Sequence, residues 1–149
     1  MTGTTDFGEV SSSSDPQCKL AFDIFIDRIL GFIGSYYVKL EGRVDALVFA
    51  GGIGEKGAIL RTRVTEKCRC LGFELDEEKN KKSVDGVVVD VGKEGARHRT
   101  LVCRTDEQVM YSPCNRRMLV LIFLDSSRWQ EDVQRMIHSS TRLRQIYAP

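Results

Sequence analysis

The sequence predicts an α/β domain, and three observations support this prediction. A helical pattern of apolar residues spans positions 16–40, an apolar run at 44–49 is typical of a strand buried on both faces, and the glycine-rich residues 51–57 lead into a second helical pattern at 58–70. Helix, strand, glycine turn and helix in this order are the elements of an α/β fold. The chain has 149 residues, which is enough for one domain with a substantial core.

The first helix begins with a capping signal. Asp15 precedes Pro16, so a side-chain acceptor stands at the N-cap and proline at the first helical position. Apolar residues then recur at steps of three and four: Phe22, Ile26, Ile29, Ile33, Tyr37 and Leu40. Gly31 and Gly34 lie inside this pattern, where each glycine costs roughly 1 kcal/mol relative to alanine. We expect them to mark close packing against another element.

Three further strands are predicted after the second helix. Residues 71–76, 87–91 and 100–104 are strand-like, and the polar residues between the last two predict a hairpin-like connection. The charged stretch 77–83 is expected to be a solvated loop. Residues 105–108 form a T-x-x-Q capping box, which predicts the start of another helix.

The sequence changes character after Ser112. Pro113 interrupts the preceding pattern, residues 118–124 are strongly apolar, and the residues after them are polar and basic. We therefore expect a domain at 1–112 and a separate tail at 113–149. The tail is expected to be either non-native or disordered.

The composition disfavours several classes of function. The net charge is +1, with acidic and basic residues nearly balanced, so neither nucleic acid nor a membrane surface is an expected partner. No apolar run approaches the roughly 18 residues that a membrane span needs, and the N-terminal residues do not resemble a secretory signal. The five cysteines match no zinc pattern, and we expect free thiols in a cytoplasmic protein: Cys18, Cys68, Cys70, Cys103 and Cys114.

The glycine-rich segment that follows the first strand is the candidate functional site. Glycines between a buried strand and a helix are typical of a loop that holds a nucleotide. A P-loop would require G-x-x-x-x-G-K-[ST]. Lys56 is not preceded by a glycine and is followed by Gly57, so the P-loop is excluded.

A dinucleotide fingerprint is a second interpretation of the same residues. Gly52, Gly54 and Gly57 satisfy G-x-G-x-x-G between a strand and a helix, and Glu74 and Asp76 lie about 20 residues further on, where a ribose-binding acid belongs. However, a long helix precedes the segment, and too little chain follows to complete two βαβαβ halves. A small dinucleotide-binding protein therefore stays as a third-ranked alternative.

The sequence motifs around the glycines lead to a third interpretation. GGIGE follows DALVF and is followed by a helix carrying LRTRV, then by LGFELDEEKN and by a strand that leads into TDEQ. Upstream lie TGTTDFGEV and the long helical stretch KLAFDIFIDRILGFIGSYY. In this order the segments resemble the acetate kinase (acetokinase) family over about residues 2–108. On this interpretation Gly57 is incidental, and the informative unit is residues 51–55.

The resemblance implies a fold and an activity. Acetate kinases belong to the actin/Hsp70/sugar-kinase-like (ribonuclease H-like) ATPase superfamily, with two α/β domains around a nucleotide cleft. They transfer a phosphoryl group between ATP and acetate, giving ADP and acetyl phosphate. Their subunits pair through the C-terminal domain, so a homodimer is expected of the full-length protein. This chain resembles part of that domain, and the N-terminal domain and the native C-terminal end are expected to be missing.

The resemblance also assigns candidate residues. Five match the nucleotide-binding loop of the family: Gly51, Gly52, Ile53, Gly54 and Glu55. Asp6 matches an aspartate that contacts the adenosine, and Glu107 matches a glutamate associated with Mg²⁺, a cation that prefers oxygen ligands. The chain departs from the family at Gly8, where an arginine is usual, and at Lys56, where an asparagine is usual.

No catalytic residue is expected in this chain. In the family, the N-terminal domain supplies the acetate pocket and the charged residues that act on the transferred phosphoryl group, so the chain is expected to be inactive alone. The sequence does not indicate which short acyl substrate is preferred. The alternative from another class is a non-catalytic module for nucleotide binding or dimerisation.

Overall fold

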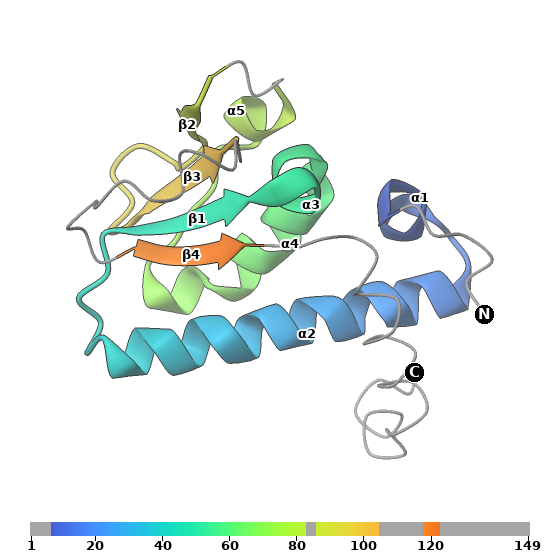
Figure 1. Cartoon of the computed structure of the whole chain (residues 1–149), viewed down its shortest axis with the longest axis horizontal. Coiled ribbons are helices and arrows are strands. Elements are labelled where there is room, and N and C mark those ends of the chain that lie inside the picture. Colours follow the sequence, from blue (N-terminus) through green and yellow to red (C-terminus); the bar gives the residue numbers. More distant parts are fainter. Residues whose placement is uncertain (1–6, 83–85, 105–117, 123–149) are drawn as a thin grey trace.

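A mixed four-stranded sheet is the centre of the fold. The computed structural model describes residues 7–82, 86–104 and 118–122 (Figure 1). The sheet has the order β2-β3-β1-β4, with strands β1 (Ala46–Ala50), β2 (Val88–Asp90), β3 (Arg99–Cys103) and β4 (Met118–Ile122). β1 runs parallel to β3 and to β4, and β2 runs antiparallel to β3. The predicted α/β class is therefore confirmed, and so is the antiparallel connection of the strands predicted at 87–91 and 100–104.

The described helices are α1 (Phe7–Ser12), α2 (Pro16–Lys39), α3 (Gly51–Lys56), α4 (Ala58–Lys67) and α5 (Glu77–Lys81), with a short 3₁₀ helix at Arg69–Leu71. Of these, α2 and α4 cover one side of the sheet. Figure 1 shows the long α2 along one side of the sheet, with α4 on the same side. None of the helices in the described ranges is both long and apolar enough to cross a membrane.

The main core lies between the sheet and these two helices. All five residues of β1 are buried, as predicted for this strand. Leu47 and Phe49 belong to the core cluster with residues of α2 and α4, whereas Ala46 and Val48 cluster with Leu101 of β3. Successive strand residues point to opposite faces, so both faces of β1 are buried.

The start of α2 follows the sequence prediction, but its glycines do not. The Asp15 carboxylate accepts a hydrogen bond from the Gln17 backbone N–H at 2.7 Å, and Pro16 follows as the first helical residue. A Cβ atom added to Gly31 or Gly34 would meet no atom of the described residues within 4 Å. The expectation that they mark close packing is therefore wrong, because they lie on a side of α2 that no described element contacts at those positions.

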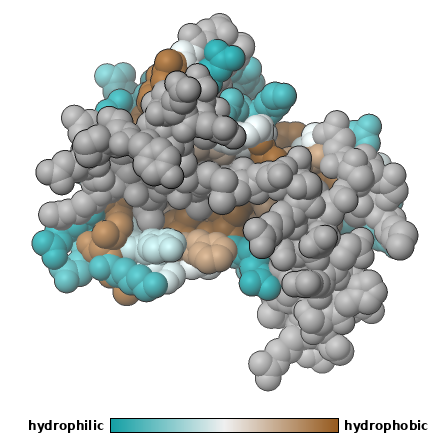
Figure 2. Space-filling view, in the orientation of Figure 1, coloured by the Kyte–Doolittle hydropathy of each residue, from teal (hydrophilic) through white to brown (hydrophobic). Residues whose placement is uncertain are grey.

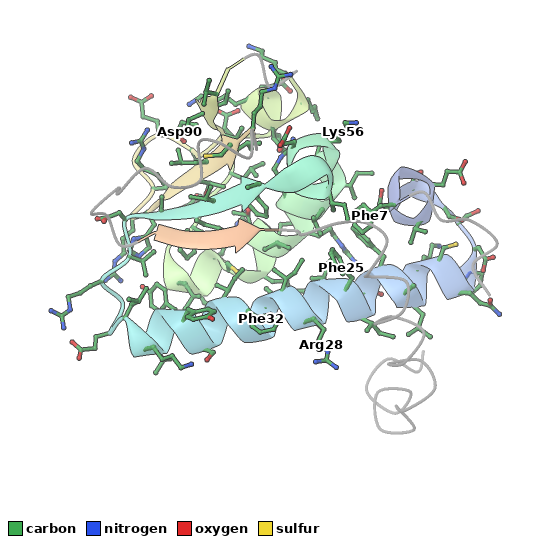
Figure 3. All side chains as sticks on the ribbon, viewed as in Figure 1. Phe7, Phe25, Arg28, Phe32, Lys56 and Asp90 are labelled. Atoms are coloured by element: carbon green, nitrogen blue, oxygen red, sulfur yellow. The ribbon has the colours of Figure 1, made fainter. Side chains whose placement is uncertain are left out.

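The same region of α2 carries apolar side chains that remain exposed. Phe32 is 58% exposed, Tyr36 is 51% exposed and Val38 is 74% exposed. Figure 2 shows hydrophobic surface in the lower part of the view, where α2 lies in Figure 1, and Figure 3 labels Phe32 there. The amphipathic pattern thus accounts for the inner face of α2 and leaves apolar side chains outside it.

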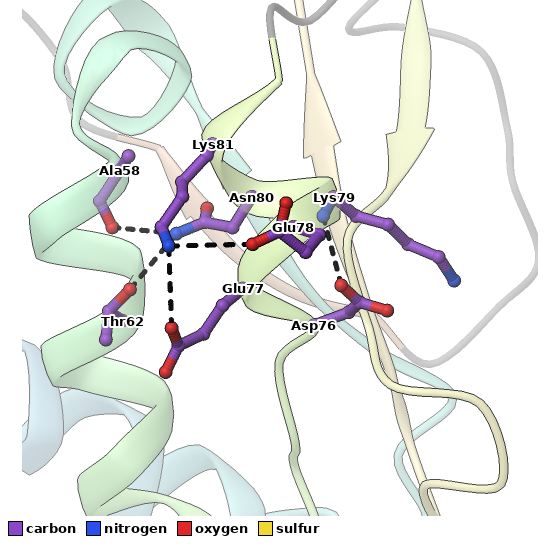
Figure 4. Close-up of polar contacts among 8 residues, drawn as sticks. All are labelled: Ala58, Thr62, Asp76, Glu77, Glu78, Lys79, Asn80 and Lys81. Atoms are coloured by element: carbon purple, nitrogen blue, oxygen red, sulfur yellow. Dashed lines mark hydrogen bonds and ion pairs between the residues drawn. The ribbon is translucent and has the colours of Figure 1, made fainter.

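Two predictions for residues 71–83 are wrong. Residues 71–76 form only isolated bridges, between Phe73 and His98 and between Leu75 and Gly92, and no regular strand. The charged stretch forms α5, because the Asp76 carboxylate caps the helix by accepting from the Lys79 N–H at 3.0 Å. This bond is also the main reason why the pKa of Asp76 is lowered. Glu77, Glu78 and Lys81 then add exposed ion pairs of 3.7 Å (Figure 4).

The boundary predicted at residue 112 stays a prediction. β4 lies beyond that boundary, and its backbone pairs in parallel with β1, from Ala46 opposite Met118 to Ala50 opposite Ile122. The helix start predicted at 105–108 lies outside the described residues.

Alanine at Gly31 should stabilise the protein. The added methyl group has free space, and alanine loses less conformational entropy in a helix than glycine, so Gly31→Ala should raise the free energy of unfolding by roughly 0.5–1 kcal/mol. Urea unfolding followed by circular dichroism measures this difference. A clear loss of stability would show that another part of the protein packs against this side of α2.

Candidate functional site

The glycine segment, residues 51–55, lies at the carboxyl end of β1. The parallel neighbour β3 ends at the same edge, because Ala50 is paired with Cys103. Figure 1 shows α3 continuing directly from the arrowhead of β1. In open α/β sheets, ligands bind outside the carboxyl ends of the strands. The structure therefore places this segment where a site of this fold class belongs.

The segment is helical, although the sequence predicted a loop. α3 covers Gly51–Lys56, and the strand turns into this helix at Gly51, whose φ of 76° lies in the left-handed region that favours glycine. Gly51 and Gly54 are buried, Ile53 and Glu55 are half-buried, and Gly52 is exposed. The five predicted residues thus form one compact turn, of which Gly52 is the most accessible.

The structure requires glycine at position 57 but not at position 52. A Cβ atom on Gly57 would lie 2.5 Å from the Ile53 carbonyl oxygen, which accepts the Gly57 N–H at 2.8 Å. Gly57 is therefore required by the junction between α3 and α4, a structural role that agrees with the expectation that this glycine is incidental to the nucleotide-binding unit. A Cβ atom on Gly52 would meet nothing within 4 Å. Packing within the described residues gives no reason for glycine there, and a backbone without a side chain can be closely approached from outside.

Two ionisable residues, Glu55 and Lys56, stand at the end of the glycine segment and directly after it. Burial raises the pKa of the Cys103 thiol, and the negative charge of Glu55 raises it further. Lys56 is exposed at the end of α3, as Figure 3 shows. The segment therefore ends in a half-buried acidic residue and is followed by an exposed basic residue.

Asp6 and Glu107, the other predicted site residues, lie outside the described residues. Next to Asp6, Phe7 is buried and its ring centroid lies 5.2 Å from that of Phe25 (Figure 3), so α1 is held on α2. Gly8, where the family has an arginine, is exposed in α1. The structure brings the residues of the glycine segment together and does not place Asp6 or Glu107 relative to them.

No metal site is formed by the described residues. Nowhere in those ranges do three histidine, cysteine or acidic side chains converge on one point. In the C-x-C pair, Cys68 is buried and Cys70 is exposed. Burial, with a smaller contribution from Cys70, raises the pKa of Cys68 to about 12. None of the four described cysteines forms a disulfide bond: Cys18, Cys68, Cys70 and Cys103.

Sequence reasoning missed two buried polar residues beneath the segment. Arg61 of α4 is 2% exposed and Asn80 of α5 is 3% exposed. The Arg61 guanidinium donates to the Gly54 carbonyl oxygen at 2.6 Å and to the Asn80 Oδ1 at 2.6 Å. A signal was present, because Arg61 stands among the inward-facing residues of α4 and Asn80 is the single amide in a charged run.

The chain matches the family model described as the acetokinase family over residues 1–112. It is 54% identical over 114 residues to a probable acetate kinase of Emericella nidulans, covering 72% of this chain and 27% of the relative. It is 38% identical over 112 residues to an acetate kinase of Lactiplantibacillus plantarum, covering 74% of this chain and 28% of the relative. The chain therefore spans less than a third of the length of these relatives.

Solved kinase structures share the fold. The acetate kinase of Entamoeba histolytica matches with a TM-score of 0.63 and 27% identity, over 70% of this chain and 28% of that protein. A propionate kinase of Francisella tularensis matches with a TM-score of 0.62 and 36% identity, over 73% of this chain and 28% of that protein. The fold is thus part of an actin/Hsp70/sugar-kinase-like ATPase domain.

Alanine substitutions at the two glycines should have different effects. Gly57→Ala should lower the free energy of unfolding by roughly 1–3 kcal/mol, because its methyl group collides with the Ile53 carbonyl. Gly52→Ala, the matched control, should not lower the free energy of unfolding, because no described atom lies within 4 Å of its added Cβ atom. Urea unfolding of the two variants measures the difference, and equal stabilities would contradict the close contact at Gly57.

The two cysteines of the C-x-C pair should react at different rates. Only the thiolate is nucleophilic, and Cys68 is buried with a pKa of about 12, whereas Cys70 is exposed. Iodoacetamide at pH 8 should therefore modify Cys70 well before Cys68, and the rate at Cys68 should still be rising above pH 10. Peptide mass mapping separates the two sites, and similar rates at pH 8 would contradict the burial of Cys68.

Proposed function

Because the chain belongs to the acetokinase family, we propose that it carries the nucleotide- and magnesium-binding part of an acetate kinase-type phosphotransferase. The complete enzyme would transfer a phosphoryl group between ATP and acetate, giving ADP and acetyl phosphate. One observation supports the nucleotide role above the others. The exposed backbone of Gly52 lies in a helical turn at the carboxyl end of a parallel strand, and no atom of the described residues occupies the position of a side chain there.

The proposed nucleotide lies against the glycine segment. At Gly52 the absence of a side chain lets the ligand approach the backbone. Asp6 would contact the adenosine, and Glu107 would hold Mg²⁺, which prefers carboxylate oxygens and neutralises charge on the phosphates. Glu107 follows β3 by four positions, and β3 ends beside β1. This connectivity supports a metal role near the segment.

We propose that the chain alone binds the nucleotide only weakly and does not turn it over. Phosphoryl transfer depends mainly on positioning and on charge stabilisation around the transferred group. In the family those groups come from the N-terminal domain, and this chain spans only 27% of its relative from Emericella nidulans. Acetate binding and pairing with a second subunit are proposals for the complete enzyme. A non-catalytic binding module stays as the alternative for this chain.

The dinucleotide-binding alternative has lost its support. Gly57 is required by its contact with Ile53. Asp76 caps α5, and Glu74 forms a 3.2 Å ion pair with Lys93. The third glycine and both candidate ribose-binding acids therefore have structural roles, and the fold is that of the acetate and propionate kinases.

Titration with Mg-ATP tests the proposed function. The chain should bind Mg-ATP, and Gly52→Ala should weaken binding about tenfold, equivalent to about 1.4 kcal/mol, because the methyl group occupies the approach to the backbone. Gly31→Ala is the matched control, since its methyl group also lies in open space but far along α2, and it should leave affinity unchanged. Isothermal titration calorimetry measures all three.

Two results would contradict the proposal. The absence of Mg-ATP binding by the unaltered chain would exclude a nucleotide role for it, and unchanged affinity in Gly52→Ala would exclude close approach at that residue. Acetate-dependent ADP formation by the purified chain would overturn the statement that it does not act alone.

A further inference from the structure

A buried guanidinium ties the end of the glycine segment to the helix that follows. Arg61 Nη1 donates to the carbonyl oxygens of Gly54 at 2.6 Å and of Glu55 at 2.7 Å. These carbonyls belong to the C-terminal part of α3, where helix carbonyls have no intrahelical partner. Arg61 supplies two of those missing donors from within the core.

The same guanidinium is held on its other side by Asn80. Arg61 Nε donates to Asn80 Oδ1 at 2.6 Å, and Nη2 donates to the Asn80 backbone oxygen at 3.1 Å. Asn80 Nδ2 in turn donates to the Ala58 carbonyl oxygen at 3.0 Å and to Thr62 Oγ1 at 3.1 Å (Figure 4). Three helices, α3, α4 and α5, are therefore connected through two buried side chains.

The arrangement has an unfavourable component. In the described part of the chain, every oxygen that accepts from Arg61 is a neutral carbonyl or amide oxygen, so no carboxylate offsets its charge. Burial removes the guanidinium from water and lowers the pKa of Arg61. The favourable component is the partial negative charge of the α3 carbonyls and the satisfaction of buried acceptors, which would be costly to leave unpaired.

A lysine could not replace this arginine. The planar fork of arginine directs donors to several sides at fixed angles, whereas lysine offers a single point charge on a flexible stem. Here the fork reaches Gly54 and Glu55 on one side and Asn80 on the other. The geometry of the fork therefore matters as well as its charge.

We propose that Arg61, fixed by Asn80, is a positioning residue for the glycine segment. It holds the two carbonyls at the end of the segment and so fixes the orientation of the turn that exposes Gly52. Its effect on ligand affinity rests on the proposed nucleotide function, whereas its effect on the order of the segment does not. Arg61 itself is only 2% exposed, so its proposed effect on the ligand acts through the segment.

The test compares Arg61→Lys with the matched control Arg63→Lys. Arg63 lies on the same helix, is exposed and forms a 3.2 Å ion pair with Asp23. Amide hydrogen exchange by NMR reports the order of the segment through the Gly57 N–H, which bonds to the Ile53 carbonyl. In Arg61→Lys this amide should exchange about tenfold faster while the buried amides of β1 do not change. Arg63→Lys should leave both unchanged.

Affinity for Mg-ATP is the second measurement. In Arg61→Lys the dissociation constant should rise about tenfold at a temperature where the variant is fully folded, whereas a purely structural role would lower global stability without changing affinity. If the unaltered chain does not bind Mg-ATP, the proposed function fails, and the exchange measurement alone decides the role of Arg61.

Two outcomes would overturn the proposal. The first is Gly57 exchange in Arg61→Lys that is no faster than in Arg63→Lys. If Arg61→Lys does not fold, Asn80→Ala takes its place, because it removes the Oδ1 acceptor and leaves the bonds to Gly54 and Glu55 possible. It should accelerate Gly57 exchange relative to β1, and equal protection at Gly57 in Asn80→Ala and the unaltered chain is the second overturning outcome.

Discussion

The burial of β1 on both faces is the constraint on which the rest of the structure depends. A strand without exposed residues needs neighbours on both edges and covering layers, and here β3 and β4 pair with it in parallel while α2 and α4 cover one face. Because the strand is held in place, the residues that follow its carboxyl end start from a fixed position. The glycine segment begins at that point.

The glycine segment combines two requirements that oppose each other. Glycine favours close approach by a ligand but also increases the flexibility of the unfolded and folded chain. In the structure, contacts with buried residues restrain the segment and limit this flexibility. Gly51 and Gly54 are buried, Gly57 is locked against Ile53, and Arg61 holds the carbonyls of Gly54 and Glu55. Gly52 is then left exposed on a turn whose other residues are held in place.

Sequence reasoning succeeded where local signals and tertiary packing agree. The Asp15-Pro16 start, the apolar steps of α2 and the apolar run of β1 each have one interpretation, and the structure confirms them. It failed where they conflict. Three glycines have low helix propensity, yet residues 51–56 are helical because β1 and Arg61 fix both ends of the turn. Residues 77–81 were predicted as a loop because they are highly charged, although Asp76 before them is the N-cap of α5.

The candidate site was predictable only in part. The sequence motif at residues 51–55 was enough to find the segment. The buried hydrogen bond between Arg61 and Asn80 beneath it joins residues nineteen positions apart, and periodicity does not reveal such a contact. Asp6 and Glu107 stay predictions.

The most direct test of the account is a Mg-ATP titration of the isotopically labelled chain followed by NMR. It should shift the amide signal of Gly52 and its neighbours in α3 first and most strongly, and shifts confined to other parts of the chain would contradict a nucleotide site at the glycine segment.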